Sequence, residues 1–100
     1  MGLKISTSLH TDKGQTSEMY LNIETLNINK KNMNHVMVNK YFNKASRDVN
    51  VDDKCNCFEV SSSYMLNVEL NDFETTYIYD LVYSKIKLEL ESKGFTVEQQ

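Results

Sequence analysis

The stretch NDFETTYIYDLVYSKIKLELESKG, residues Asn71–Gly94, carries both a start signal and a stop signal for a helix. Asn71 can cap the first turn, and Glu74 stands at the spacing of a capping box. Gly94 suits the left-handed position that follows the last turn of many helices. These signals predict one long helix over about residues 72–93.

Apolar side chains form two stripes around this helix at about 100° per residue. The narrow stripe holds Phe73, Tyr77, Leu81 and Leu88, and the broad one holds Ile78, Tyr79, Val82, Tyr83, Ile86 and Leu90. Packing on a sheet buries one stripe, so the second meets either another chain or a loop of the same chain. The predicted interface residues are Tyr79, Tyr83, Ile86 and Leu90. Residues 85–91 also alternate at strand spacing, but continuity with the capped first half favours a helix.

The residues before this helix alternate between apolar and polar side chains, which is the pattern of β-strands. A first strand is predicted from about Leu3 to His10, followed by a turn in which Gly14 takes a positive φ. A second strand begins near Glu18. Its apolar face changes side near residues 24–25, which predicts a β-bulge there.

A polar hairpin turn at residues 29–32 leads into a third strand, Met33–Phe42. This strand is apolar on both faces, so we expect it inside the sheet. An exposed polar loop is predicted at about residues 43–56. The cleanest alternation then runs over Phe58–Leu70 and predicts a strand of roughly 43 Å.

Phe95 and Val97 suit a short final edge strand, so the order of elements is β-β-β-β-α-β. This order predicts a single α+β domain over residues 1–100. We expect a mostly antiparallel sheet of about four to five strands with the long C-terminal helix packed on it.

Composition excludes several classes of protein. The net charge is −3 and the 11 basic residues are scattered, so we expect no contact with nucleic acid. No apolar run approaches the length of a membrane span, and the first residues lack the apolar block of a signal peptide. Two cysteines do not make a disulfide framework. We therefore expect a soluble protein made in a reducing cytoplasm.

One segment of the polar loop has the spacing of a calcium-binding loop. Asp48, Asn50, Asp52, Asn56 and Glu59 stand at positions 1, 3, 5, 9 and 12 of an EF-hand loop. The position that needs Gly is occupied by Asp53, and the flanking residues read as strands rather than helices. A solvated loop without a metal is the favoured interpretation, and these five residues are the candidate ligands otherwise.

Cys55 and Cys57 form a C-x-C pair, and the only histidines are His10 and His35. Zinc requires about four ligands at a different spacing, so free structural thiols are expected. A nucleophile, a base and an orienting group are not placed together by the sequence. We therefore expect no catalytic site, no cofactor and no small-molecule substrate.

The chain resembles the small virion proteins of tailed bacteriophages that are found at the neck, tail or capsid surface. The features that carry this resemblance are small size, a Pro-free and Asn/Lys-rich composition, a long hairpin at Met19–Phe42, and one helix on a sheet. The resemblance implies assembly in the host cytoplasm into a ring, tube or shell of the virion. The partners would be copies of itself and neighbouring virion proteins.

The expected function is therefore that of a non-enzymatic structural protein that assembles through protein–protein contacts. The alternative is a small metal-binding or catalytic domain that uses the loop at residues 48–59 together with Cys55, Cys57 and His35.

Overall fold

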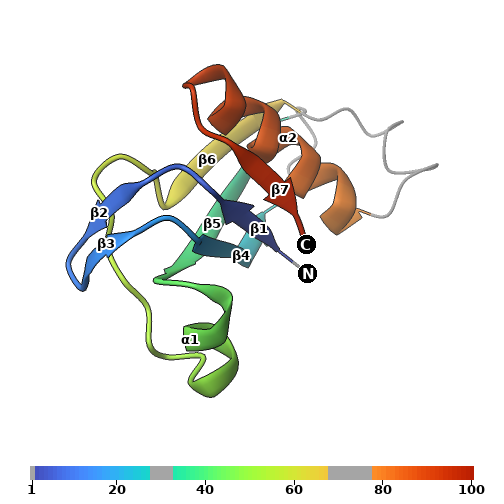
Figure 1. Ribbon diagram of the computed structural model, residues 1–100. Coiled ribbons are helices and arrows are strands. Elements are labelled where there is room, and N and C mark those ends of the chain that lie inside the picture. Colours follow the sequence, from blue (N-terminus) through green and yellow to red (C-terminus); the bar gives the residue numbers. More distant parts are fainter. Residues whose placement is uncertain (1, 28–32, 68–77) are drawn as a thin grey trace.

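The computed structural model describes residues 2–27, 33–67 and 78–100 (Figure 1). The strands of this part are β1 Leu3–Ile5, β2 Leu9–Thr11, β3 Gly14–Thr16, β4 Met19–Asn27, β5 Met33–Tyr41, β6 Ser63–Asn67 and β7 Val97–Gln99. Its helices are α1 Lys44–Val49 and α2 Ile78–Ser92. The predicted hairpin turn at 29–32, the predicted strand end at 68–70 and the predicted helix start at 71–77 lie outside the described residues.

Five strands form one antiparallel sheet in the order β6-β5-β4-β1-β7, and β2 pairs with β3 in a separate hairpin. The α+β class, the antiparallel sheet and the final edge strand are therefore confirmed. Strand β5 lies inside the sheet, as its two apolar faces indicated. The two chain ends lie side by side (Figure 1), and Gly2 and Gln100 exchange backbone hydrogen bonds of 3.3 and 2.8 Å.

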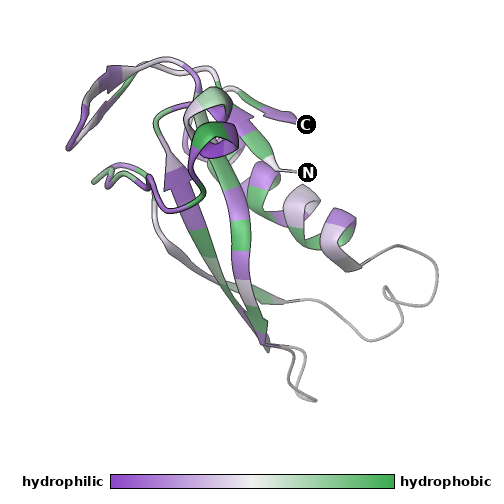
Figure 2. Cartoon of the chain, turned by 90° about the horizontal axis from the view of Figure 1, so that it is seen from below, coloured by the Kyte–Doolittle hydropathy of each residue, from purple (hydrophilic) through white to green (hydrophobic). Residues whose placement is uncertain are grey.

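The long hairpin of β4 and β5 contains the expected bulge. The register shifts between Ile23 and Thr25, which is where the apolar face of the sequence changes side. Figure 2 shows hydrophobic and hydrophilic residues alternating along the strands. Met19 and Leu21 thus face the core, whereas Tyr20 points to the other side of the sheet.

Helix α2 packs on the core face of the sheet and is buried along one stripe. That stripe holds Val82, Tyr83, Ile86 and Leu90. The strand side chains in the same core cluster include Leu3, Ile5, Met19, Leu21, Val36, Val38 and Val97. Three of the four predicted interface residues, Tyr83, Ile86 and Leu90, therefore lie in the chain's own core. They cannot form an exposed interface, and only Tyr79 stays exposed.

The end of α2 follows the sequence signal. Gly94 has a φ of 93°, and Phe95 donates its backbone N–H to the carbonyl of Leu90 at 3.2 Å. A residue with a side chain would be strained at this φ, so Gly94 fixes the point at which the chain leaves the helix. The turn into β7 then returns the chain to the edge of the sheet.

The segment predicted as an exposed polar loop at residues 43–56 contains helix α1, so that prediction is wrong for its first half. Asn43 caps the helix by accepting the N–H of Ser46 at 2.7 Å. Helix α1 lies on the outer face of the sheet, opposite α2, where the Arg47 guanidinium is 5.2 Å from the centre of the Tyr20 ring. No residue of α1 is buried. Its sequence therefore has no apolar stripe that would have predicted a helix.

Two predicted strands are shorter than expected. The first breaks after Ile5, because Ser6 donates its N–H to Thr96 and the Thr7 hydroxyl accepts the N–H of Thr96 at 2.9 Å. The chain then continues into the separate hairpin of β2 and β3. The strand predicted from Phe58 begins only at Ser63, and the residues before it form a turn.

Candidate functional site

The five residues with calcium-loop spacing are spread along the segment. Asp48 lies in α1 and pairs with the arginine before it. The side-chain oxygen of Asn50 accepts the N–H of Asp52 at 3.0 Å, while Asn56 and Glu59 lie farther on, beside the β2–β3 hairpin. Within the described residues, no three His, Cys, Asp or Glu side chains gather as metal ligands would. The described residues therefore supply no ligand cluster that supports the metal-binding alternative.

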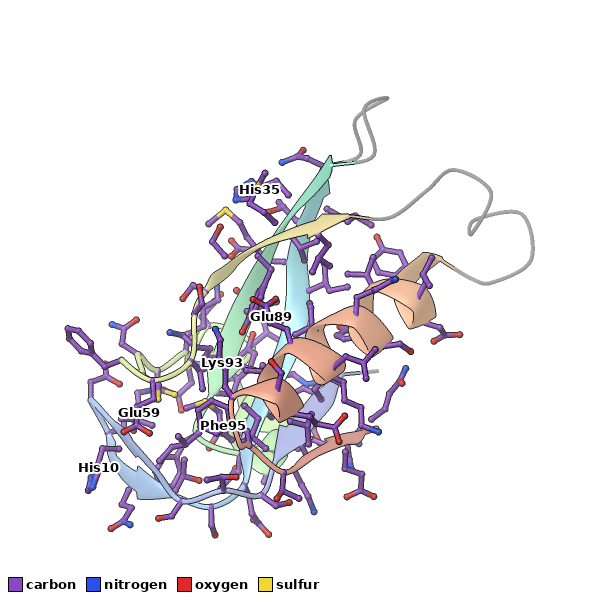
Figure 3. The ribbon with its side chains drawn as sticks, turned by 90° about the horizontal axis from the view of Figure 1, so that it is seen from above. His10, His35, Glu59, Glu89, Lys93 and Phe95 are labelled. Carbon is purple, nitrogen blue, oxygen red and sulfur yellow. The ribbon has the colours of Figure 1, made fainter. Side chains whose placement is uncertain are left out.

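The two histidines lie at opposite ends of the molecule (Figure 3). On the outer face of the sheet, His35 Nε2 lies 2.6 Å from the Oγ of Ser63, a contact that the sequence does not reveal. A serine nucleophile also needs a group that orients the histidine and donors for the oxyanion. In the described part of the chain this ring makes no contact with a carboxylate. The pair is therefore read as a cross-strand hydrogen bond between β5 and β6.

Cys55 and Cys57 are both free and buried in the core, as expected of structural thiols. Burial raises the pKa of the Cys55 thiol, and the nearby Asp12 carboxylate raises it further. A higher pKa keeps the thiol protonated and therefore a poor nucleophile at neutral pH. Both side chains pack in the hydrophobic core.

The most unusual buried group is the ammonium of Lys40, which is on the core side of β5 and only 7% exposed. It donates to the carbonyl oxygens of Cys57 at 3.1 Å and Val60 at 2.9 Å. The carbonyl of Lys40 in turn accepts the N–H of Cys55 at 2.8 Å. Burying a charged group is costly unless its donors are paired. Lys40 and the segment from Cys57 to Val60 therefore hold each other in place.

We call residues Cys57–Val60 the Phe58 turn. Its two end residues are buried, whereas Phe58 at the tip is fully exposed and Glu59 beside it is exposed as well. The Lys40 ammonium therefore binds both ends of the turn in the core, while the aromatic side chain of Phe58 stays in solvent. Strand alternation predicted instead that Phe58 and Val60 would share one face.

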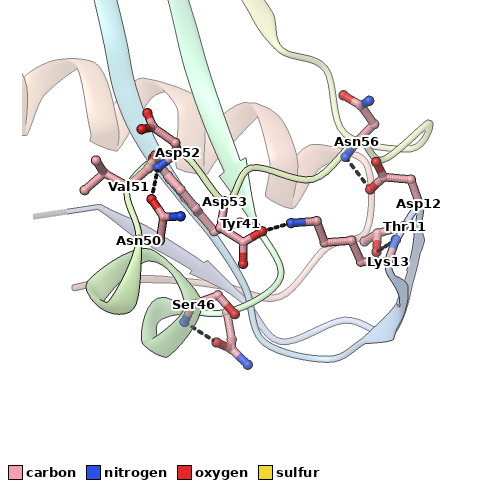
Figure 4. Close-up of polar contacts among 11 residues, drawn as sticks. Thr11, Asp12, Lys13, Tyr41, Ser46, Asn50, Val51, Asp52, Asp53 and Asn56 are labelled. Atoms are coloured by element: carbon pink, nitrogen blue, oxygen red, sulfur yellow. Dashed lines mark hydrogen bonds and ion pairs between the residues drawn. The ribbon is translucent and has the colours of Figure 1, made fainter.

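An open hollow of about 440 Å³ lies between the Phe58 turn and the β2–β3 hairpin. It is lined by His10, Thr11, Asp12, Asn56, Phe58 and Glu59, of which Phe58 is the one apolar residue. The hairpin is fixed to the opposite wall, because Asp12 and Asn56 exchange hydrogen bonds of 3.1 and 2.8 Å (Figure 4). Lys13 and Asp53 add an ion pair between the same two segments. Figure 3 shows His10 and Glu59 at this end of the molecule.

A second exposed area lies on the outer face of the sheet. We call it the outer sheet patch and define it by Asn22, His35, Met37, Asn39, Ser63 and Met65. Met37 is 39% exposed and Met65 is 59% exposed. The Asn39 amide donates to the Asn22 side-chain oxygen at 3.1 Å. None of the six residues is Lys, Arg, Asp or Glu, so the patch is uncharged in the convention that counts His as neutral.

The sequence contains a signal for the buried ammonium of Lys40, which the prediction of a third strand did not use. In a strand, Val36, Val38 and Lys40 share one face, and the first two are apolar. A lysine on an otherwise apolar face indicates either an interruption of the core or a buried cation with partners. No comparable signal marks the turn, because its carbonyl acceptors are present in every residue.

No known protein family, curated protein or solved structure matches this chain. Among the described residues, no helix is both long enough and apolar enough to cross a membrane.

Proposed function

We propose that this chain is a non-enzymatic structural protein that assembles with copies of itself through the outer sheet patch. The observation that carries the proposal is the pair Met37 and Met65, both exposed on neighbouring strands. A solvent-facing sheet surface normally carries polar side chains. Two exposed methionines at diagonal positions on it suit a surface that packs against another protein, since Met adapts to varied partners.

Charge favours a second copy as the partner of this patch. The whole chain carries a net charge of −3, which gives two copies a weak overall repulsion. The six residues of the outer sheet patch include no acidic or basic residue, and the two exposed charged side chains that border Met37 and Asn39, Glu24 and Lys54, have opposite signs. Two copies can therefore pack there without a set of like charges meeting. Strand β6 also forms one edge of the described sheet, and an edge strand offers backbone groups for pairing with another chain.

The virion as the place of this assembly is supported by the sequence resemblance described above. A virion protein of this size works as one of many identical subunits, and closed symmetry requires that each subunit carry a surface for its neighbours. The outer sheet patch, with two exposed methionines among neutral polar residues, meets that requirement.

The test is the solution mass measured by light scattering. We expect the wild-type protein to show a multiple of the 11.6 kDa chain mass. The Met37→Lys and Met65→Lys double variant places two like charges at the contact and should run as a single chain. Leu88→Lys, at an exposed apolar residue of α2, is the matched control and should keep the wild-type mass. A wild-type mass of one chain contradicts the proposal.

A further inference from the structure

We infer that the Phe58 turn and the hollow beside it form a docking site for a partner protein that presents an apolar side chain flanked by lysine or arginine. This inference extends the proposed function, because it assigns a second surface to contacts with a different protein. It rests on the exposure of Phe58, on the way the turn is held, and on the charge of the hollow.

The core holds the backbone of the turn that carries Phe58. The buried ammonium of Lys40 binds the carbonyls at both ends, Cys57 and Val60, and these two side chains are themselves buried. A loop that is ordered before binding loses less conformational entropy when a partner docks. Phe58 therefore has two properties of a binding anchor, a large apolar surface and a position on an ordered backbone.

The hollow supplies space beside that anchor. Its volume of about 440 Å³ is within the range of sites that receive side chains or small molecules, and Phe58 gives it one apolar wall. The hydrogen bonds between Asp12 and Asn56 hold the two walls together. An apolar side chain of a partner can therefore enter the hollow while Phe58 packs against the partner's surface.

Charge selects the class of partner. Two of the six lining residues, Asp12 and Glu59, are carboxylates, and none is Lys or Arg. The nearby Lys13 is paired with Asp53, and no ion pair within the described residues includes Asp12 or Glu59. A second copy of the chain would bring the same carboxylates face to face, which is repulsive. A partner with basic residues beside its apolar side chain gains attraction instead.

The experiment selects binders from a library of random short peptides displayed on phage, with the purified full chain as the target. We expect the enriched peptides to share an apolar residue flanked by lysine or arginine. One enriched peptide is then labelled, and its affinity is measured by fluorescence anisotropy. Phe58→Ser should weaken it roughly thirtyfold, the loss typical of a hot-spot aromatic. Glu59→Gln should weaken it roughly threefold.

Leu88→Ser removes an exposed apolar side chain on α2 and is the matched control; it should leave the affinity unchanged. Acidic peptides, the absence of enriched peptides, or equal binding to Phe58→Ser and wild type would overturn the inference. The solution mass reports on the outer sheet patch independently. A loss of peptide selectivity with an intact oligomer rejects only this docking site, whereas a single-chain mass rejects the proposed self-assembly.

Discussion

The Phe58 turn and the outer sheet patch both expose apolar side chains, but the core beneath each is different. Beneath the turn, the Lys40 ammonium is paired with two backbone carbonyls. Beneath the patch, on the core side of β6, the Tyr64 hydroxyl is buried and has no hydrogen-bond partner within the described residues. The turn thus depends on a buried polar group, whereas the patch is held by the pairing of β5 and β6.

The two surfaces also differ in charge, and the difference indicates different partners. The hollow beside Phe58 has two carboxylates in its lining, while the patch has no charged residue. Attraction at the hollow should fall when the ionic strength rises from about 0.1 M to about 1 M, since the Debye length shortens from about 10 to about 3 Å. Packing of Met37 and Met65 at the patch depends on no charge and should persist or strengthen under those conditions.

The largest effect is expected for Lys40→Met. The substitution keeps the apolar stem but leaves the carbonyls of Cys57 and Val60 buried without a donor, which should cost about 3 kcal/mol in the free energy of unfolding. Urea denaturation measures this change in the free energy of unfolding. Lys4→Met is the control, because Lys4 is partly exposed at 3.6 Å from Glu98 and should change stability by about 0.5 kcal/mol or less. A Lys40→Met protein as stable as wild type would show that the ammonium does not hold the turn.

Alkaline pH should destabilise the protein through its buried tyrosines. Burial raises the pKa of Tyr64 well above its usual range, with a smaller contribution from the Glu89 carboxylate, and burial also raises the pKa of Tyr83. Each neutral phenol stabilises the fold fully below the unfolded pKa of about 10, and this contribution is lost as the pH rises toward the folded pKa. Stability should therefore fall above about pH 10, by up to about 1.4 kcal/mol per pH unit for each group. A flat profile there would contradict this account of the core.

A smaller effect of opposite sign to that of Lys40→Met is expected for Tyr64→Phe. Removing a buried hydroxyl that has no partner within the described residues should increase the free energy of unfolding by about 1 kcal/mol. Tyr83→Phe is the matched control, because its hydroxyl accepts the N–H of Ile23 at 2.8 Å, and it should decrease stability by about 1 kcal/mol. If both variants lose stability equally, the two hydroxyls have similar surroundings.

The smallest effect on stability is expected for Phe58→Ser. The side chain is fully exposed, so its removal should change the free energy of unfolding by about 0.5 kcal/mol or less. Urea denaturation checks this value. A loss of several kcal/mol would mean that Phe58 packs against the chain itself and is not a free anchor.

Periodicity alone was sufficient for the elements whose pattern repeats. The alternation along β4 and β5, the bulge near Thr25 and the helix end at Gly94 all follow from local signals. The start of the long helix lies outside the described residues. Helix α1 was missed because it buries none of its residues, although Asn43 stands at the capping distance from Ser46.

The turn was missed because a long-range contact overrides a local pattern. Phe58 and Val60 alternate as in a strand, but the Lys40 ammonium binds the carbonyls at both ends of a turn there. Strand pairing resumes only where Val38 donates its N–H to Ser62 at 2.9 Å. Local alternation carries no information about a cation about twenty residues away, so the candidate site required the structure.

The central claim is that copies of this chain meet at the outer sheet patch and not at the Phe58 turn. Sedimentation velocity of three proteins tests it: wild type, Phe58→Ser, and the Met37→Lys and Met65→Lys double variant. We predict that Phe58→Ser keeps the wild-type oligomer and that the double variant sediments as one 11.6 kDa chain. Dissociation of Phe58→Ser, or an oligomer that survives both methionine substitutions, would contradict the claim.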